Sequence, residues 1–440
     1  MSAKHNVIFT IAPGGNLQGS LRVPGDKSIS HRSIMLGALA EGVTEVSGFL
    51  QGEDNLATLN AFRALGVKIE GPDKGKVTIH GVGMDGLKAP TAPLDLGNSG
   101  TAMRLLCGLL AAQAFDCVLT GDASLSTRPM RRVTEPLARM GAKVETSATG
   151  TPPLTCHGGR ALKGFEYEMP VASAQVKSCL LLAGLFAMGE TCVIEPAPTR
   201  DHTERMLMGF GYPVDVDGKR ICVAGGGKLT ATSIDVPADI SSAAFFLVGA
   251  SICPGADLLL EHVGINPTRD GVINILRLMG ADIELLNRRE MGGEPVADIR
   301  VRYSPLKGIT IPEAQVPLAI DEFPVLFVAA ACAEGETVLT GARELRVKES
   351  DRIQVMADGL RILGVDATPT EDGMVIQGGK IGSGRLQSHG DHRIAMAFAM
   401  ASLRASGPIE IEDCANVNTS FPDFVGLATG VGLKVTQVSA

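Results

Sequence analysis

Two hydrophobic patterns alternate along the chain. In the first, a segment with helical spacing ends in a glycine between apolar residues and then continues as a strand-like run. A glycine at this position is typical of the left-handed residue that ends a helix before the chain turns into a strand. Six such segments occur, and their central glycines are Gly66, Gly141, Gly211, Gly280, Gly364 and Gly432.

The second pattern predicts helices that are apolar nearly all round. Each is rich in Ala, Leu and other small residues and is followed by a turn and an apolar strand, such as residues 190–195. A helix without a polar face is expected to be buried. The six predicted helices begin near Ser28, Ser99, Ser173, Ser241, Asp321 and Asp391.

The two patterns together define six units, spaced by about 70 residues, that are too long for a solenoid of short repeats. We predict an α/β fold of two similar domains, each built from three units of the βαβαββ type. The N-terminal domain is expected to span residues 20–237. The C-terminal domain is expected to combine residues 238–440 with residues 1–19, including a short strand at Val7–Ala12.

Composition narrows the class of protein. A net charge of −8 argues against a nucleic-acid-binding surface, and no apolar run is long enough to span a bilayer. The first residues do not resemble a signal peptide, so we expect a cytoplasmic protein. The nine cysteines form no Cys-x-x-Cys pair, and most lie in apolar runs, so we predict reduced, buried thiols rather than a disulfide or zinc framework. Examples are Cys107, Cys179, Cys253 and Cys332.

Cations at the starts of the buried helices need an explanation. The Ser, Asn and Asp residues there are ordinary N-caps. Lys27, Arg32 and Arg393 are different, because a cation near a helix N-terminus opposes the helix dipole. Their position is favourable if an anion is bound, since backbone N–H groups at the same place also attract an anion.

Further cations lie in the connecting loops. Any one of them could be a solvated surface charge, but together, in an acidic chain, they predict a site for more than one anionic group. Among them, the carboxylates of Asp321 and Glu349 are the best candidates for proton transfer, because neighbouring cations would keep them ionised. The loop cations are Arg128, Arg200, Arg346, Lys348 and Arg352.

Other chemistries lack their motifs. There is no P-loop sequence and no Gly-x-Gly-x-x-Gly that opens a βαβ unit. The histidines show no clear metal-ligand spacing, so no metal is predicted. His392, beside Asp391, is expected either to cap a helix or to assist proton transfer, and the cap is favoured. A non-catalytic anion-binding protein on a duplicated scaffold remains an alternative, and the paired carboxylates argue against it.

Four segments give the chain a specific resemblance. From about Gly14 to Phe424 it resembles the EPSP synthase (3-phosphoshikimate 1-carboxyvinyltransferase) family. The resemblance implies an inside-out α/β barrel in each domain, with the active site in the cleft between the domains. The segments are Gly25-Asp-Lys-Ser-Ile-Ser-His-Arg32, Gly97-Asn-Ser-Gly-Thr-Ala-Met-Arg104, Arg346-Val-Lys-Glu-Ser-Asp-Arg352 and Gly390-Asp-His-Arg393.

The family's reaction is implied in the same way. It transfers the enolpyruvyl group of phosphoenolpyruvate to the 5-hydroxyl of shikimate 3-phosphate, by addition and elimination, on the shikimate pathway to chorismate and the aromatic amino acids. Asp321 would take the hydroxyl proton, and Glu349, with Lys27, would handle the methylene proton. Shikimate 3-phosphate would be held by Lys27, Ser28, Arg32, Ser173, Ala174, Gln175, Arg200, Asp321 and Lys348. Phosphoenolpyruvate would be held by Lys27, Gly100, Arg128, Gln175, Arg352 and Arg393.

The chain departs from the enterobacterial and plant pattern at two places. Ala174 replaces a second serine, for which Arg200 is expected to compensate, and Thr419 replaces a lysine of the phosphoenolpyruvate pocket. A second branch of the family is resembled instead by three segments, Ser173-Ala-Gln-Val-Lys177, Arg200-Asp-His-Thr-Glu204 and Asn266-Pro-Thr-Arg269. Members of that branch are often less sensitive to glyphosate, and some respond to monovalent cations. We expect a monomer that requires no cofactor, with stimulation by a monovalent cation as an open expectation.

The nearest alternative is the sister enzyme that transfers enolpyruvyl to UDP-N-acetylglucosamine. That enzyme typically carries a Lys-Asn pair where this chain has Lys27-Ser28. It also often has a reactive cysteine in the loop that corresponds to residues 124–129, which contains none here.

Overall fold

The computed structural model describes residues 7–439, and contacts divide the chain into two compact units. The N-terminal unit comprises Gly25–Val236 and Met291–Glu294. The C-terminal unit comprises the residues up to Pro24, Pro237–Glu290 and the residues from Pro295 onward. The sequence placed the first boundary after residue 19, but β2 (Gln18–Leu21) pairs with β17 (Asp257–Gly264) of the C-terminal unit, so the boundary lies after Pro24.

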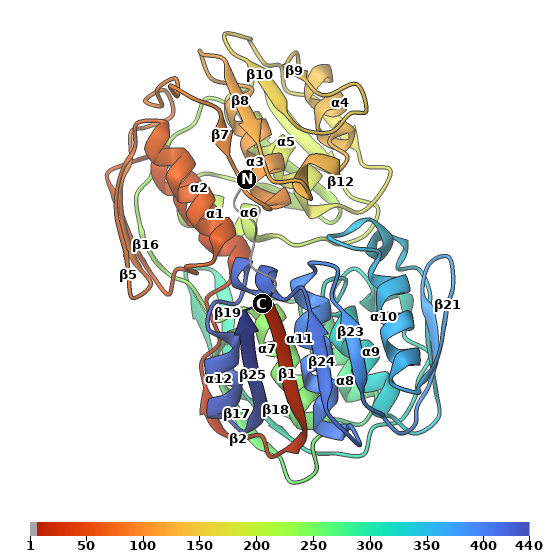
Figure 1. The fold of residues 1–440 in the computed structure, drawn as a ribbon. Helices are drawn as coiled ribbons and strands as arrows, with labels where there is room; N and C mark the ends of the chain where they lie inside the picture. The colour runs from red at the N-terminus through yellow and green to blue at the C-terminus, as the bar shows by residue number, and fades with distance from the viewer. Residues whose placement is uncertain (1–6, 440) are drawn as a thin grey trace. The chain divides into compact units, whose positions relative to one another are not determined.

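The N-terminal unit contains three four-stranded sheets and six helices (Figure 1). The inner helices are α1 (Lys27–Leu39), α3 (Gly100–Leu110) and α5 (Ala174–Gly184), and the others are α2 (Glu53–Ala64), α4 (Arg131–Arg139) and α6 (His202–Gly209). The first sheet has the order β16 (Ser233–Asp235), β4 (Val43–Ser47), β6 (Lys76–His80), β5 (Lys68–Asp73). The second has β7 (Leu94–Asp95), β8 (Cys117–Thr120), β10 (Leu154–His157), β9 (Lys143–Glu145). The third has β11 (Glu166–Glu168), β12 (Glu190–Ile194), β14 (Arg220–Ala224), β13 (Asp215–Asp217). A short pair joins β3 (Ala40–Glu41) to β15 (Leu229–Thr230).

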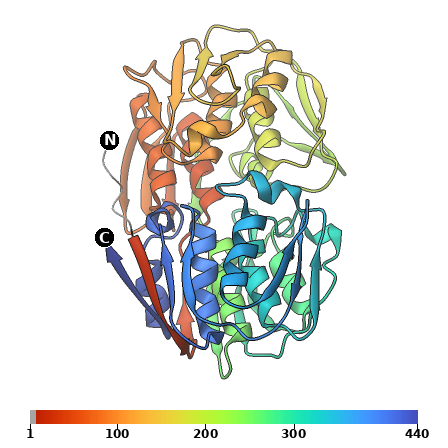
Figure 2. The same cartoon turned by 45° about the vertical axis from the view of Figure 1, so that its right-hand side comes forward.

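The C-terminal unit repeats this arrangement. Its inner helices α7 (Ile240–Ile252), α9 (Phe323–Cys332) and α11 (His392–Ala401) pack against one another, and the others are α8 (Gly271–Leu278), α10 (Arg352–Ile362) and α12 (Phe424–Gly430). One sheet has the order β18 (Asp282–Met291), β19 (Glu294–Arg302), β17, β2. Another has β20 (Glu336–Leu339), β22 (Met374–Gln377), β21 (Asp366–Pro369). The third has β23 (Gly384–Gln387), β24 (Ile409–Glu412), β1 (Val7–Gly15), β25 (Leu433–Ser439). The N-terminal strand therefore belongs to the second half, as predicted (Figures 1 and 2).

A common pairing pattern shows that the sheets are copies of one unit. In each four-stranded sheet of the N-terminal unit, a parallel pair is followed by two antiparallel pairs. The sheet that contains β1 has the same order of parallel and antiparallel pairs. In the three-stranded sheet, an isolated parallel bridge between Thr310 and Val338 takes the place of the missing strand. The predicted α/β repeat is confirmed.

The two hydrophobic patterns correspond to two structural elements. The apolar segments form the six inner helices within two residues of their expected starts, and all 13 residues of α7 are buried. The six glycines have φ angles between 77° and 112°, in the left-handed region where residues other than glycine are strained. The glycine therefore ends each helix and lets the chain enter the next strand.

The cysteines depart from the prediction. Cys192 and Cys222 form a disulfide between β12 and β14, so the expectation of reduced thiols throughout is wrong for this pair. They were missed because strand register, not sequence spacing, places them opposite each other. The seven others are free, and Cys332 is partly exposed whereas the other six are buried.

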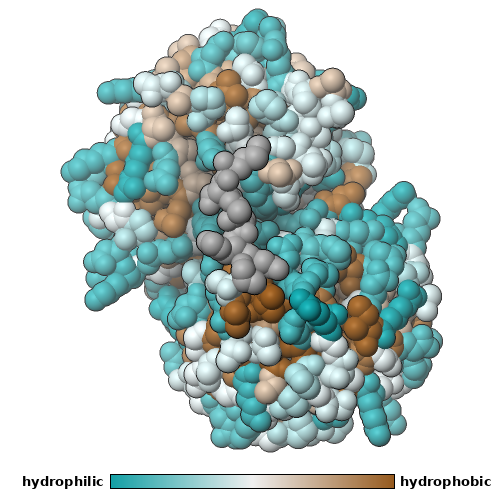
Figure 3. Space-filling model, viewed as in Figure 1, coloured by the Kyte–Doolittle hydropathy of each residue, from teal (hydrophilic) through white to brown (hydrophobic). Residues whose placement is uncertain are grey.

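The described residues contain no helix that is long and apolar enough to cross a membrane. Each unit has its own hydrophobic cluster. On the face drawn in Figure 3, hydrophilic residues are interspersed with small apolar patches in both units.

Candidate active site

In the N-terminal unit, hydrogen bonds join the starts of the three inner helices. His31 of α1 lies 3.4 Å from the Ser99 hydroxyl, which caps α3. Gln175 of α5 donates to Thr101 of α3 at 2.9 Å, and Arg32 of α1 donates to Ser178 of α5 at 2.9 Å. The residues that the sequence singled out at these three helix starts are therefore neighbours.

Three hydrogen bonds fix the position of the Arg32 side chain. Its guanidinium donates to Thr203 at 2.7 Å and to the Ser28 carbonyl at 3.0 Å, in addition to Ser178. Burial lowers the pKa of Arg32 to about 10, and the nearby charge of Arg200 acts in the same direction. The group thus stays charged at neutral pH, and a fixed, desolvated cation beside Arg200 is suited to a phosphate or carboxylate.

Arg128 and Gly100 lie close together in a second arrangement of this unit. The Arg128 side chain, which follows the short helix η1 (Leu125–Thr127), donates to Asn98 at 2.7 Å, and Asn98 donates to Asp122 at 2.8 Å. Gly100 is the first residue of α3, and a Cβ there would lie 3.0 Å from the Arg128 Nη1 atom. A small anion could reach both the helix start and the guanidinium only because residue 100 is a glycine.

The other predicted residues of this unit lie at the same helix ends. Lys27 forms an ion pair with Asp54, and its side chain is 21% exposed. Ser28 is buried in the first turn of α1. Ser173 caps α5 by accepting from the Val176 amide, and Ala174, the first residue of that helix, is partly exposed.

Sequence reasoning missed one buried ionic cluster next to these residues. Lys177 of α5 is 1% exposed and lies 2.6 Å from Glu204 and 3.1 Å from Glu195. Burial raises the pKa of Glu204 although Lys177 opposes the rise. Because Glu204 lies on α6 beside Thr203, the cluster fixes α6 against α5 and so fixes the hydroxyl that holds Arg32. The sequence did contain a signal for this cluster, namely a lysine inside an otherwise apolar helix.

In the C-terminal unit, Arg352 organises the predicted carboxylates. Its side chain is 1% exposed and contacts Glu349 at 2.6 Å, Asp391 at 2.8 Å and Asp321 at 3.4 Å. Burial alone would lower the pKa of Arg352, but the three carboxylates raise it. Burial would likewise raise the pKa of Asp391, yet Arg352 lowers it. Both groups are therefore charged at neutral pH.

Asp321 lies among three cations, as the sequence predicted. Its carboxylate is 3.5 Å from Lys348, 3.4 Å from Arg352 and 3.9 Å from Arg393. Arg393 also donates to the Asp321 carbonyl at 3.1 Å, which ties the start of α11 to the segment before α9. With its side chain 14% exposed, Asp321 is accessible enough to accept a proton from a bound hydroxyl.

Two positioning residues of this unit were not predicted. Glu322 is 1% exposed, accepts from Ser241 of α7 and lies 3.6 Å from Arg393. Arg269 lies 3.2 Å from Asp239, the N-cap of α7, and also donates to Ser241. From the sequence, Arg269 was noted only as part of a segment that resembles the second branch of the family. Glu322, which directly follows Asp321, was not considered as a site residue.

Two other positions have mainly structural contacts. Arg346 donates to Asp351 at 2.6 Å and to the carbonyls of Thr370 and Glu371, so it fixes the segment around the short helix η3 (Arg343–Val347). Thr419 ends the short helix η5 (Ala415–Thr419), where its hydroxyl donates to the Asn416 carbonyl at 2.7 Å.

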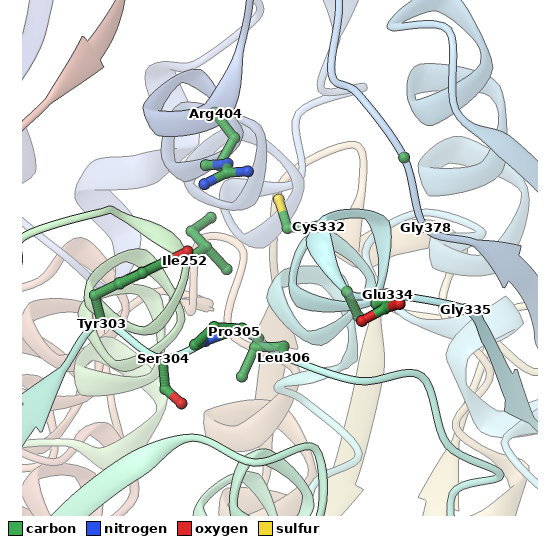
Figure 4. A pocket seen from close by; sticks show the side chains of 12 residues that line it. Ile252, Tyr303, Ser304, Pro305, Leu306, Cys332, Glu334, Gly335, Gly378 and Arg404 are labelled. Carbon is green, nitrogen blue, oxygen red and sulfur yellow. The ribbon is translucent and has the colours of Figure 1, made fainter.

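A pocket of about 320 Å³ in the C-terminal unit is separate from these residues (Figure 4). It lies at the opposite ends of the inner helices, beside Ile252 and Cys332, the last residues of α7 and α9. Tyr303 and Arg404 also line it, whereas none of the predicted site residues does. The candidate site is thus defined by the helix starts and not by this pocket.

His31 gives a pH-dependent prediction. Burial lowers the pKa of its imidazole, and Lys27 and Arg32 lower it further, while its Nδ1 atom is 2.8 Å from the Thr58 hydroxyl. Below pH about 6.5 the unfolded chain binds a proton that the folded chain does not. As the pH decreases below this value, the proton bound by the unfolded chain should lower the free energy of unfolding by up to about 1.4 kcal/mol per pH unit.

The variant His31→Gln should show a smaller loss of stability between about pH 7 and pH 5, measured by urea unfolding. Equal slopes for the wild type and His31→Gln would contradict the prediction.

Comparisons with known proteins all indicate the same family. Residues 11–427 match the family model described as EPSP synthase (3-phosphoshikimate 1-carboxyvinyltransferase). A 3-phosphoshikimate 1-carboxyvinyltransferase of Methylococcus capsulatus is 72% identical over 98% of both chains. One of Alkalilimnicola ehrlichii is 71% identical over 98% of this chain and 97% of its own. A solved structure of EPSP synthase from Acinetobacter baumannii has a TM-score of 0.89 and 63% identity, and the match covers 98% of this chain and 100% of that one.

Proposed function

The chain belongs to the EPSP synthase family, and from this membership and the two clusters of charged residues we propose how its own residues perform the reaction. It is a transferase that moves the enolpyruvyl group of phosphoenolpyruvate to the 5-hydroxyl of shikimate 3-phosphate and releases phosphate. The reaction belongs to the shikimate pathway, which leads to chorismate and the aromatic amino acids. Its substrates are small, multiply charged anions, which suits the excess of cations at the helix starts.

We assign the binding roles by the contacts of each residue. Arg32 and Arg200, with the helix start at Ser173 and Gln175, supply the charges and N–H groups for shikimate 3-phosphate. Ser28, Ala174 and Lys348 complete that set. Phosphoenolpyruvate is assigned to Gly100, Arg128, Gln175, Arg352 and Arg393, with Lys27 contacting both substrates. Each of the two units contributes one part of this set, and we propose that both parts act on the same pair of substrates.

The single observation that supports the chemistry is the position of Asp321. It lies within 4 Å of Lys348, Arg352 and Arg393, and from this position its carboxylate accepts the 5-hydroxyl proton. Glu349, 2.6 Å from Arg352, is the second acid or base. With Lys27 it protonates the methylene carbon of phosphoenolpyruvate and later removes a proton as phosphate leaves. The cations stabilise the charge on the phosphate and carboxylate groups throughout.

Phosphate release from phosphoenolpyruvate tests the acceptor. The purified chain should release inorganic phosphate when shikimate 3-phosphate is present and should release none above background with UDP-N-acetylglucosamine. Release with the sugar nucleotide alone would replace this function by that of the sister enzyme.

Omitting metal ions and testing potassium chloride against tetramethylammonium chloride would show whether the reaction proceeds without a cofactor and whether a monovalent cation stimulates it. Size-exclusion chromatography with light scattering tests the expected monomer.

Gly100→Ala should separate inhibitor from substrate. The new methyl group would lie 3.0 Å from the Nη1 atoms of Arg104 and Arg128, both at the ends of flexible side chains that can shift. Glyphosate resembles phosphoenolpyruvate but is longer, so the methyl group should obstruct it more. We expect the ratio of the glyphosate inhibition constant to the KM for phosphoenolpyruvate to rise about 10- to 200-fold. Equal increases in the two constants would limit Gly100 to a role in the turn.

A further inference from the structure

Two cysteines and a glutamate gather on the third sheet of the N-terminal unit, on elements that the reaction does not use. Cys192 of β12 and Cys222 of β14 are direct partners in the antiparallel register, and the Glu190 carboxylate is 3.3 Å from the Cys192 sulfur. We propose that, once the disulfide is reduced, these three side chains bind a thiophilic divalent cation of the zinc and cadmium class. Among residues 7–439 this is the one group whose His, Cys, Asp or Glu ligand atoms converge in this way.

Strand geometry places all three ligands on one face. Thr191 and Val223 point toward Gly184 of α5, since a Cβ at Gly184 would lie within 3 Å of both side chains. Side chains alternate along a strand, so Glu190, Cys192 and Cys222 lie on the other face. Ala224 is the register partner of Glu190 and is small and exposed, while Cys192 and Cys222 themselves are buried.

The charges on this face suit a cation. The Glu190 side chain is 53% exposed, and Arg220 pairs with it at 3.5 Å. Arg220 lies closer to Glu166, at 2.9 Å, so Glu190 can turn toward a metal without leaving that arginine unpaired. By register, Glu166 flanks Cys192 and the exposed Asp215 flanks Cys222. The face is therefore acidic around the two sulfurs.

The ligand set fits tetrahedral coordination. Two sulfurs at zinc–sulfur distances of about 2.3 Å stand about 3.8 Å apart, a separation that two cysteines on facing positions reach by small side-chain rotations. The carboxylate supplies the third ligand, and a water molecule can supply the fourth. Thiolates favour zinc and cadmium over magnesium or calcium, which prefer oxygen ligands.

The chemistry balances with a dithiol as the reductant. The disulfide accepts two electrons and two protons, giving two thiols, while the dithiol becomes a cyclic disulfide. The cation then displaces two protons and binds both thiolates together with the Glu190 carboxylate.

The preceding repeat provides an internal control. Cys117 of β8 and Cys156 of β10 are also direct register partners, but both are free, buried thiols. Cys156 interacts with Cys107 of α3, so this pair faces the core, and no carboxylate joins it in a ligand group. This unit thus contains two pairs of facing cysteines. Of the two pairs, Cys192 and Cys222 are the pair with a carboxylate beside them and acidic residues around them.

Cobalt(II) absorption tests the proposal on the full-length protein. The chain is reduced with a dithiol, freed of reductant without oxygen and titrated with Co²⁺. We expect one equivalent to give a thiolate-to-cobalt charge-transfer band that Zn²⁺ and Cd²⁺ abolish. The untreated, disulfide-bonded protein should give no band, and Cys156→Ser should titrate like the wild type.

Variants of the three ligands decide the outcome. Cys192→Ser and Cys222→Ser should lose the band while keeping the circular dichroism of the wild type. Glu190→Gln, at an exposed position that leaves the fold intact, should weaken Co²⁺ binding by at least about tenfold. Absence of a band in the reduced wild type, or a band that survives in Cys222→Ser, would overturn the site. If Glu190→Gln bound Co²⁺ as tightly as the wild type does, the assignment of three ligands would be wrong.

Discussion

Replacing Asp321 by Asn is expected to lower kcat by about 10²–10⁴, the usual range for the loss of a positioned acid or base. The amide cannot accept the hydroxyl proton, although it retains the shape of the carboxylate. Lys348 and Arg352, at 3.5 Å and 3.4 Å, lose a charged partner, but Arg352 keeps Glu349 and Asp391. Steady-state kinetics should therefore show a fall in kcat that is much larger than any change in the Kd for shikimate 3-phosphate.

Asp351→Asn is the matched control for this measurement. Asp351 is a carboxylate of the same unit that pairs with Arg346 and caps α10, and asparagine is also a good N-cap. Its kcat should stay close to that of the wild type. Near-normal turnover in Asp321→Asn would remove Asp321 from the mechanism, and Glu349 would then be the remaining candidate for the base.

The periodicity of hydrophobic residues was enough to predict the fold, because the repeated elements of the fold follow from local conformational rules. The helix-ending glycines need a positive φ wherever they occur, and the inner helices need a buried environment because they have no polar face. The candidate site was predicted for a related reason, since cations at the starts of these helices are unfavourable without an anion. The resemblance then gave each of them a role, which the residue pattern by itself did not.

Long-range contacts could not be predicted in this way. The disulfide depends on Cys192 and Cys222 being register partners, and two residues 30 positions apart carry no local signal of that pairing. Glu322 and Lys177 are charged residues in apolar segments, and their partners Arg269, Glu195 and Glu204 lie in other elements. The boundary near Pro24 likewise depends on the pairing of β2 with β17.

Arg352→Gln is expected to lower the free energy of unfolding of the C-terminal unit by about 3–5 kcal/mol, the cost of leaving a buried charge without its partner. Asp391, with a side chain that is 0% exposed, would lose the guanidinium that lies 2.8 Å away. Arg361→Gln is the control, because its ion pair with Asp358 is about half exposed and should contribute about 1 kcal/mol or less. Urea unfolding of the full chain, with and without the two substrates, measures both effects.

The double variant Arg352→Gln/Asp391→Asn separates the structural role of Arg352 from its role in the reaction. Neutralising Asp391 removes the unpaired buried charge, so a substantial part of the lost stability should return. Activity should not return, because a neutral glutamine side chain in place of Arg352 could neither hold Glu349 nor attract the charge of phosphoenolpyruvate. We therefore expect a folded protein whose kcat/KM for phosphoenolpyruvate stays at least about 100-fold below that of the wild type, as for loss of a charged group that stabilises the transition state. Recovery of both stability and activity would mean that Arg352 acts only by neutralising Asp391.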